Sequence, residues 1–273
     1  MAYSSKDMAR EAGMTTEGLR FYEKSGIIKV KKNAKNGYRV YEVMQVPFLR
    51  MAKILNTYGI PLHDIRRFFH KGDEALGGLL ATMEQKQEDL RLELWRKGRI
   101  LERLEYQSDL IRRAVEDPAQ IWFCTRPAIA YLEYYGASAL RRNKELQQTL
   151  EAWVTQMPLV YPMPVLHQKD IGNPSAYCPA GFYCYVEDME KLGLKENRFV
   201  RMVPRQQYLC GISRQDNPQL IVSSSALTPL LATAEKMNLR VAGDVFFLSF
   251  AVTQPQEEVQ RLFYQVLMPV VAK

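Results

Sequence analysis

The sequence predicts a multidomain α+β protein with an N-terminal winged helix-turn-helix, a long coiled-coil helix and a C-terminal α+β domain. The whole net charge of +7 falls within residues 1–115, which hold 22 Lys and Arg against 15 Asp and Glu, whereas residues 116–273 hold 15 of each. The C-terminal part also holds 18 of the 29 aromatic residues. A basic first part predicts a polyanionic partner, and a neutral, aromatic-rich second part predicts apolar contacts or a pocket.

Two short helices are expected at the start of the chain. Ser4 and Ser5 are N-cap candidates for a helix that reaches residue 12, and Gly13 ends it. A second helix begins at Thr15 or Thr16 and reaches about residue 24, before Gly26 stops it. Two short helices joined across a glycine-containing turn form a helix-turn-helix pattern.

A basic hairpin is expected next, over 27–41, because its residues alternate around the turn candidate Asn36-Gly37. Its cations are Lys29, Lys31, Lys32, Lys35 and Arg39. Two packing helices follow, one with helical periodicity over 43–58 and one that begins near Pro61.

A heptad repeat of mostly apolar residues runs from residue 76 to residue 115, in alternating steps of four and three residues. Its twelve positions read Leu, Leu, Met, Gln, Leu, Leu, Lys, Leu, Leu, Ser, Ile and Val. Such a seam predicts a coiled-coil helix over 74–116 that forms a homodimer. The alternative is one amphipathic helix that lies on its own domain. Domain boundaries are therefore expected at 1–73, 74–116 and 117–273.

The C-terminal domain reads as strands rich in aromatic and β-branched residues, interrupted by two helices. Strands are expected in "IWFCTRPAIAYLEYYG", "AYCPAGFYCYVED", "RFVRMVPRQQYLCGI" and "GDVFFLSFAV", and helices in "SALRRNKELQQTLEAWVTQM" and "TPLLATAEKMNL". The four cysteines form no C-x-x-C pair, so we expect reduced thiols.

Residues 4–69 resemble the MerR family of transcriptional regulators. The resemblance rests on "T-x-x-x-L-R-F-Y-E-K-x-G-I-I" at 15–28 and on "GYRVY" at 37–41. The order of elements beyond residue 117 is similar to the GyrI-like ligand-binding domain of drug-sensing, BmrR-like members. The family implies a homodimeric activator that distorts double-stranded promoter DNA so that RNA polymerase can engage it.

The same resemblance assigns DNA-binding residues. Arg20 and Tyr22 are expected on the exposed face of the second helix, with Phe21 packed inward, and a core position for Tyr22 and Tyr41 is the alternative. The implied contacts are Thr16, Arg20 and Tyr22 from the helix, and Lys31, Lys35, Tyr38, Arg39 and Tyr41 from the wing.

An aromatic box with an acid is expected in the C-terminal domain, because strand alternation groups tyrosines with Glu133 and with Glu187. Such a box suits a lipophilic cation. The candidate ligand-binding residues are Trp122, Tyr131, Glu133, Tyr135, Tyr177, Phe182, Tyr183, Tyr185, Glu187 and Phe247. The competing interpretation is that these aromatics only fill a sheet interface, and Gln265 stands where related domains often show an acid.

Other chemistries find little support in the sequence. The spacing of Cys and His does not indicate a metal or redox sensor, no nucleophile motif indicates a hydrolase, and neither a cofactor nor a catalytic residue is expected. A C-terminal domain that docks a protein, or that needs no ligand, remains an alternative. No apolar run is long enough to span a bilayer and no signal peptide is recognisable, so a cytoplasmic protein without membrane contact is expected.

Overall fold

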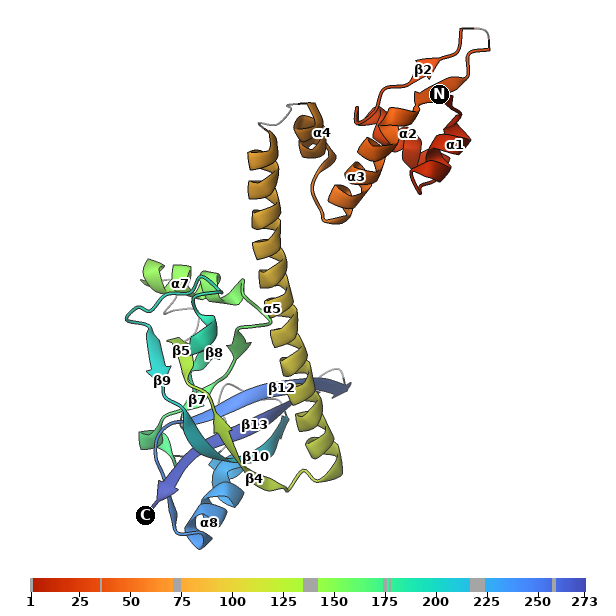
Figure 1. The fold of residues 1–273 in the computed structure, drawn as a ribbon. Coiled ribbons are helices and arrows are strands. Elements are labelled where there is room, and N and C mark those ends of the chain that lie inside the picture. Colours follow the sequence, from red (N-terminus) through yellow and green to blue (C-terminus); the bar gives the residue numbers. More distant parts are fainter. Residues whose placement is uncertain are drawn as a thin grey trace. The chain divides into compact units, whose positions relative to one another are not determined.

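The computed structural model describes residues 2–34, 36–70, 75–134, 142–173, 176, 178–216, 224–256 and 259–273. Its contacts divide the chain into two compact units, residues 1–95 and 96–273, and each unit is described by itself. One helix, α5, contributes residues to both units (Figure 1).

The N-terminal unit is a winged helix-turn-helix, as the sequence predicts. Ser4 caps the first helix by accepting a hydrogen bond from the Asp7 amide, and Thr15 caps the second through the Gly18 amide. These caps satisfy backbone donors that the first turn of a helix leaves free. The elements are β1 (Ala2–Tyr3), α1 (Ser5–Glu11), α2 (Thr16–Lys24), β2 (Lys31–Lys32), β3 (Arg39–Glu42), η1 (Val43–Gln45), α3 (Val46–Thr57) and α4 (Leu62–His70).

The wing is a short antiparallel sheet with the strand order β1-β3-β2. Lys31 lies opposite Val40, and Gly37 turns the chain at φ 70°, a conformation that glycine adopts without steric cost. Strand β1 pairs Tyr3 with Tyr41 and is not predicted by the sequence, because two residues carry no periodic signal. The N-terminal segment therefore covers the edge of β3.

A single apolar core holds this unit together. Met8, Leu19, Leu49 and Ile65 are fully buried, one from each of the four helices α1 to α4. Tyr41 from the wing strand joins the same core. Burial of such side chains contributes about 1.5–3 kcal/mol each, and this packing fixes the exposed face of α2 relative to the wing.

Helix α5 (Ala75–Glu116) is continuous over 42 residues, which confirms the long helix that the heptad predicts. Leu110 is buried near its C-terminal end. Many of the other heptad positions are exposed in the single chain: Leu76, Leu80, Leu94, Leu101, Leu104 and Val115 are each more than half exposed. Within the described ranges, no helix combines the length and apolar composition that a membrane span requires.

The C-terminal unit contains two antiparallel sheets, which confirms the predicted α+β class (Figure 1). The larger sheet has the order β4-β10-β13-β12-β7, with β11 paired to β13, and the smaller has the order β6-β8-β5-β9. The strands are β4 (Ile121–Arg126), β5 (Ile129–Tyr134), β6 (Tyr161–Pro162), β7 (Val165–Leu166), β8 (Ala180–Tyr185), β9 (Val200–Val203), β10 (Gln206–Asp216), β11 (Leu239–Val241), β12 (Val245–Gln256) and β13 (Val259–Ala272). The helices are α7 (Lys144–Val154) and α8 (Thr228–Lys236), with short 3-10 turns η3 (Gln168–Asp170), η4 (Val186–Asp188) and η5 (Ser224–Leu227).

The larger sheet separates two apolar layers, because successive residues of a strand point to opposite faces. Phe246 of β12 packs in the layer that includes Tyr131, Tyr183 and Leu110 of α5, whereas Phe247 packs with Leu230 of α8. Strand β13, which the sequence analysis does not single out, lies between β10 and β12 and contributes to both layers. None of the four cysteines, all of which lie in the described ranges, forms a disulfide.

Gly181 on β8 permits a close approach by Tyr131 of the neighbouring strand. The Tyr131 hydroxyl donates to the Met163 carbonyl at 2.8 Å, and its ring lies so close to Gly181 that an added Cβ would overlap the ring and stand 2.8 Å from Cε2. Buried Tyr131 cannot shift without losing this hydrogen bond. Gly181 is therefore a packing requirement.

We expect Gly181→Ala to lower the free energy of unfolding by about 2–4 kcal/mol, because overpacking displaces a buried ring and its hydrogen bond. Chemical denaturation of the purified chain measures this. The control is Gly98→Ala on α5, where an added Cβ meets no atom within 4 Å and alanine should stabilise the helix by about 0.5–1 kcal/mol. Equal effects of the two substitutions would contradict the assignment.

Candidate nucleic-acid interface and effector pocket

The orientation of α2 follows from Leu19, which is fully buried. A residue three positions later lies on the same side of a helix, so Tyr22 is also buried, at 7% exposure. Arg20 and Thr16 are exposed, and Phe21 is 54% exposed. The prediction that Tyr22 faces outward and Phe21 inward is therefore wrong, and the core alternative for Tyr22 is correct.

Burial also raises the pKa of Tyr22, whose hydroxyl interacts with Asn56 of α3. This hydroxyl is directed at a neighbouring helix. Tyr22 therefore positions α2, and the exposed reading face is formed around Thr16, Arg20 and Phe21.

Glu23 of α2 ties the helix to the wing. Its carboxylate accepts a hydrogen bond from the Tyr41 hydroxyl at 3.2 Å and lies 3.4 Å from Nε of Arg39. Tyr41 is fully buried, so the core alternative is correct for it as well. Arg39 remains exposed beside it.

Two further predicted wing residues, Lys31 and Tyr38, are exposed. Tyr38 lies after the Gly37 turn with most of its surface free, and Lys31 pairs with Glu42 at 2.6 Å. Lys35 lies outside the residues that the structure describes. Of the predicted contacts, Thr16, Arg20, Lys31, Tyr38 and Arg39 thus present exposed side chains.

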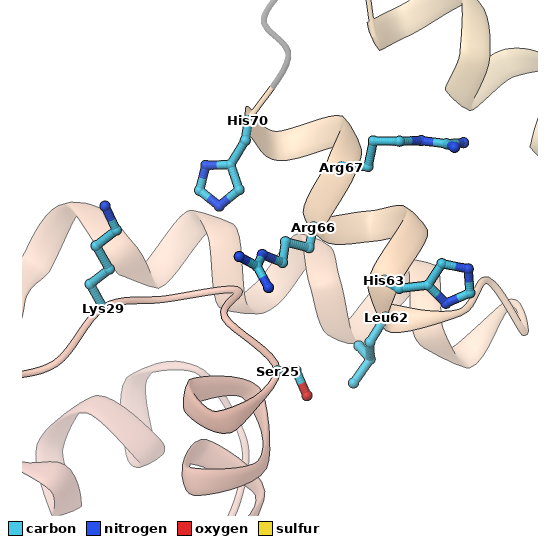
Figure 2. Close-up of a pocket in the computed structure, with 7 residues that line it drawn as sticks. All are labelled: Ser25, Lys29, Leu62, His63, Arg66, Arg67 and His70. Carbon is cyan, nitrogen blue, oxygen red and sulfur yellow. The ribbon is translucent and has the colours of Figure 1, made fainter.

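A basic depression beside α4 was missed by the sequence analysis. It measures about 820 Å³ and is lined by Ser25, Lys29, Leu62, His63, Arg66, Arg67 and His70. Figure 2 shows Arg66 and His70 directed toward the segment that carries Lys29, whereas Arg67 and His63 point to the other side of α4.

The charges of this depression are only partly balanced. Asp64 lies 3.3 Å from both His63 and Arg67. Among the described residues, neither Lys29 nor Arg66 forms an ion pair. The sequence signal that could have predicted this depression is the alternation of polar and apolar residues in "HDIRRFFH", because the polar face of that helix is cationic.

The predicted aromatic box is divided among several faces. Tyr131 and Tyr183 are buried in the layer between the sheets, and Trp122 and Tyr185 pack against it. Two other predicted residues lie elsewhere. Phe247 packs with α8, and the ring of Phe182 stacks on Tyr134 at a centroid distance of 6.2 Å. Tyr135 and Tyr177 lie outside the described residues.

Both predicted acids are already paired with basic residues. Glu133 lies 3.1 Å from His167 and 3.9 Å from Arg201. Glu187 belongs to η4, beyond the end of β8, and forms an ion pair with Arg99 of α5. Neither carboxylate is left to neutralise a bound cation.

A cavity of about 150 Å³ lies beside α5 in the C-terminal unit. It is lined by Arg99, Glu102, Arg103, Tyr106, Leu159, Tyr161, Tyr185 and Asp188. Of these, only Tyr185 was predicted. The others belong to α5, to β6 and the residue Leu159 shortly before it, and to η4, which lie far apart in the sequence.

Arginines already occupy the tyrosine faces around this cavity. The guanidinium carbon of Arg103 stands 4.1 Å from the ring centroid of Tyr161, that of Arg126 stands 4.6 Å from Tyr106, and that of Arg99 stands 5.7 Å from Tyr185. Each arrangement is a cation–π contact.

The carboxylates of this region gather on Arg99. Asp188 lies 2.8 Å from it and Glu102 2.9 Å, and Glu187 completes the set. Burial opposes the charge of Arg99, but these three acids raise its pKa above the ordinary value. Burial also raises the pKa of Asp188, although Arg99 acts in the opposite direction.

Tyr106 of the cavity lining has a polar, uncharged partner outside the cavity. Tyr106 donates a hydrogen bond to Oε1 of Gln265, which is fully buried on β13. Burial raises the pKa of Tyr106 well above its ordinary value. Across the described residues, no three His, Cys, Asp or Glu side chains gather as a metal site would require.

Comparison with known proteins supports the DNA-binding interpretation of the N-terminal unit. Residues 3–71 match the family profile described as MerR HTH family regulatory protein. The class of protein that this match indicates for the N-terminal unit is the DNA-binding transcriptional regulator, and residues 3–71 are similar to the MerR HTH family.

Curated relatives agree with this class. An HTH-type transcriptional regulator of Haemophilus influenzae is 26% identical over 117 residues, 42% of this chain and 87% of that protein. SkgA of Caulobacter vibrioides is 27% identical over 160 residues, 55% of this chain and 61% of that protein. YyaN of Bacillus subtilis is 31% identical over 72 residues, 26% of this chain and 52% of that protein.

Two solved structures were also matched. EcmrR in a complex with DNA has a TM-score of 0.38 at 14% identity, with 99% of this chain and 100% of that chain covered. HiNmlR, described as a MerR family regulator lacking the sensor domain and bound to promoter DNA, has a TM-score of 0.32 at 26% identity, with 42% of this chain and 89% of that chain covered.

Asp244 is the centre of a polar network that reaches Glu133 of β5 through His167. It accepts hydrogen bonds from the Gln168 amide at 2.9 Å and from Arg201 at 2.6 Å, and it lies 3.3 Å from His167. Burial opposes its ionisation, but these partners more than offset that effect, so the pKa of Asp244 lies below the ordinary 3.8.

We expect Asp244→Asn to lower the free energy of unfolding at pH 7 by about 1–3 kcal/mol, the range for hydrogen bonds to charged groups. Because the folded-state pKa is depressed, the stabilisation is present above the unfolded pKa near 3.8 and is lost as pH falls through the folded value. The variant should therefore lose less stability than the parent between pH 5 and lower pH in urea unfolding. Asp170→Asn, a carboxylate without an ion pair among the described residues, is the control.

Proposed function

We propose that the protein is a transcription activator that binds promoter DNA as a homodimer and responds to a small molecule bound in its C-terminal domain. The proposed divisions are a DNA-binding domain at 1–73, a dimerisation helix at 74–116 and an effector domain at 117–273. The single observation that carries the proposal is the match of residues 3–71 to the MerR family, over a domain whose exposed face is cationic.

The proposed DNA interface consists of the exposed side chains on α2 and on the wing. Arg20 is suited to a guanine edge or a phosphate, and Thr16 to a phosphate or base contact. Lys31, Tyr38 and Arg39 would hold flanking phosphates. Tyr22 and Tyr41 support these residues from the core, and the basic depression around Lys29 and Arg66 adds further phosphate-binding capacity.

The proposed dimer interface is the exposed apolar stripe of α5. Large apolar side chains repeated at heptad spacing over a helix of 42 residues are costly in water and are stabilised by a second such helix. A homodimer also presents two reading heads, as a two-fold symmetric operator requires.

The effector domain is proposed to act through α5. Arg99, Arg103 and Tyr106 of this helix line the cavity, so a ligand there contacts the helix that also carries the dimer stripe. An effector that binds better when the dimer distorts its promoter would shift the protein toward that state and so aid RNA polymerase. The two-sheet fold is compatible with the GyrI-like, drug-sensing type that the order of elements resembles.

The sequence predicts a lipophilic cation as the effector, but the contacts around the cavity disfavour a positively charged ligand. Glu133 and Glu187 are paired, and arginines cover the tyrosine faces that a cation would need. The cavity favours a small-molecule effector over a domain that only docks a protein. The matched relatives bear the names of transcriptional regulators, and a hydrolase gains no support from the described residues.

We expect Arg20→Ala to lower the affinity for a duplex selected by the protein from a random library by tenfold or more, because a direct arginine contact is worth about 1–3 kcal/mol. Fluorescence anisotropy at several salt concentrations measures the affinity and its salt dependence. Arg205→Ala, which removes an exposed arginine from the C-terminal unit, is the charge-matched control. Equal losses in the two variants would contradict a specific role for Arg20.

We expect the double substitution Leu94→Glu and Leu101→Glu to convert the dimer to a monomer and to reduce duplex affinity in parallel, because four acids would face one another across the seam. Sedimentation equilibrium measures the mass. Leu92→Glu, on the same helix but off the heptad stripe, should leave the dimer intact. A parent chain that sediments as a monomer at micromolar concentration would refute the dimer.

A further inference from the structure

We propose that the cavity beside α5 binds an organic anion, specifically a carboxylate or sulfonate carried on a single aromatic ring. This inference rests on the proposed function, since it names the chemical class of the effector for that cavity. It reverses the charge that the sequence alone suggested.

The first observation is the environment of Arg126 on β4. Its side chain is buried, at 8% exposure, and among the described residues no carboxylate forms an ion pair with it. Its neighbours are the rings of Tyr106 and Tyr185 and the hydroxyl of Tyr183. A guanidinium remains charged in proteins, and a buried charge without a partner of opposite sign is costly.

The second observation is that Arg103 also lacks a carboxylate partner among the described residues, and that it shares a hydrogen-bond acceptor with Arg126. Arg103 donates to the Tyr183 hydroxyl oxygen at 3.4 Å, and Arg126 donates to the same oxygen at 3.1 Å. The part of the chain that the structure describes gives Arg103 no carboxylate partner. Two cations therefore converge on one neutral hydroxyl, and a bound anion would relieve their repulsion.

The carboxylates nearby do not supply this anion. Glu102, Glu187 and Asp188 all bind Arg99. The cavity lining consequently has one neutralised arginine, Arg99, and one arginine without a carboxylate, Arg103, whereas Arg126 contacts the lining residues Tyr106 and Tyr185 without lining the cavity itself. A ligand carboxylate in the cavity can accept the forked N–H donors of Arg103.

The third observation concerns the surrounding donors. Gln265 is fully buried, its Oε1 accepts from Tyr106, and its Nε2 has no hydrogen-bond partner. Gln265 lies outside the cavity lining, so behind Tyr106 it adds a neutral partner and no negative charge.

The size and walls of the cavity define the remainder of the ligand. A volume of about 150 Å³ corresponds to one benzene-sized ring. Tyr161, Tyr185 and Leu159 belong to the lining, with Arg103 and Arg99 over the two tyrosine rings. An aromatic ring enclosed by this lining would place its anionic group toward Arg103.

The test uses three ligands of one shape and different charge: benzoate, benzamide and benzylammonium. Isothermal titration calorimetry on the full-length protein should show benzoate binding at least tenfold more tightly than benzamide, with benzylammonium weakest. Benzoate should also raise the melting temperature of the parent chain, because a ligand that binds only the folded state stabilises it.

Variants at Arg103 separate charge recognition from folding, because this side chain is only half-buried. Arg103→Gln should weaken benzoate at least tenfold and leave benzamide within twofold. Arg103→Lys should recover part of the benzoate affinity. Arg112→Gln on the same helix, an exposed arginine paired with Asp109, should change neither.

Three results would overturn the inference: benzylammonium binding as tightly as benzoate, equal affinity for benzoate and benzamide, or unchanged benzoate binding in Arg103→Gln. Absence of binding by all three ligands would also overturn it. None of these results touches the DNA-binding function, which depends on the behaviour of Arg20→Ala, so the two proposals fail separately.

Discussion

The continuity of α5 is the constraint on which the other features depend. A helix of 42 residues holds its side chains at fixed angular intervals, so the same turn spacing that exposes Leu94 and Leu101 directs Arg99, Arg103 and Tyr106 toward the C-terminal sheets. Neither set can be rotated without rotating the other. The α5 residues that line the cavity and the apolar stripe are therefore carried by one helix.

Local sequence signals predicted the N-terminal unit and α5 well. Capping residues Ser4 and Thr15 and the Gly37 turn act over a few residues, and each appears in the structure as expected. The long helix that the heptad repeat predicts is also present. The orientation of α2 failed because the expectation for Tyr22 came from a motif and ignored Leu19, whose burial decides the inward face. The basic depression was missed because its residues come from α4 and from the loop after α2.

The C-terminal pocket was less predictable because its contacts are non-local. Strand alternation correctly groups Tyr183 with Tyr185, whose rings are in contact. It cannot reveal that arginines from α5 and from β4 cover the tyrosine rings, since those contacts join segments tens of residues apart. Glu187 was assigned to the strand face although β8 ends at Tyr185, and two residues of error at a strand end changed its partner to Arg99.

The tie made by Glu23 restricts how this protein can diversify. One carboxylate contacts both the Tyr41 hydroxyl and Arg39, and so adds a polar tie between α2 and β3 to the apolar core that already packs them together. Replacing Glu23 would remove both polar contacts in one step. New target preferences are therefore more accessible through the exposed positions of α2 than through any change in the angle between helix and wing.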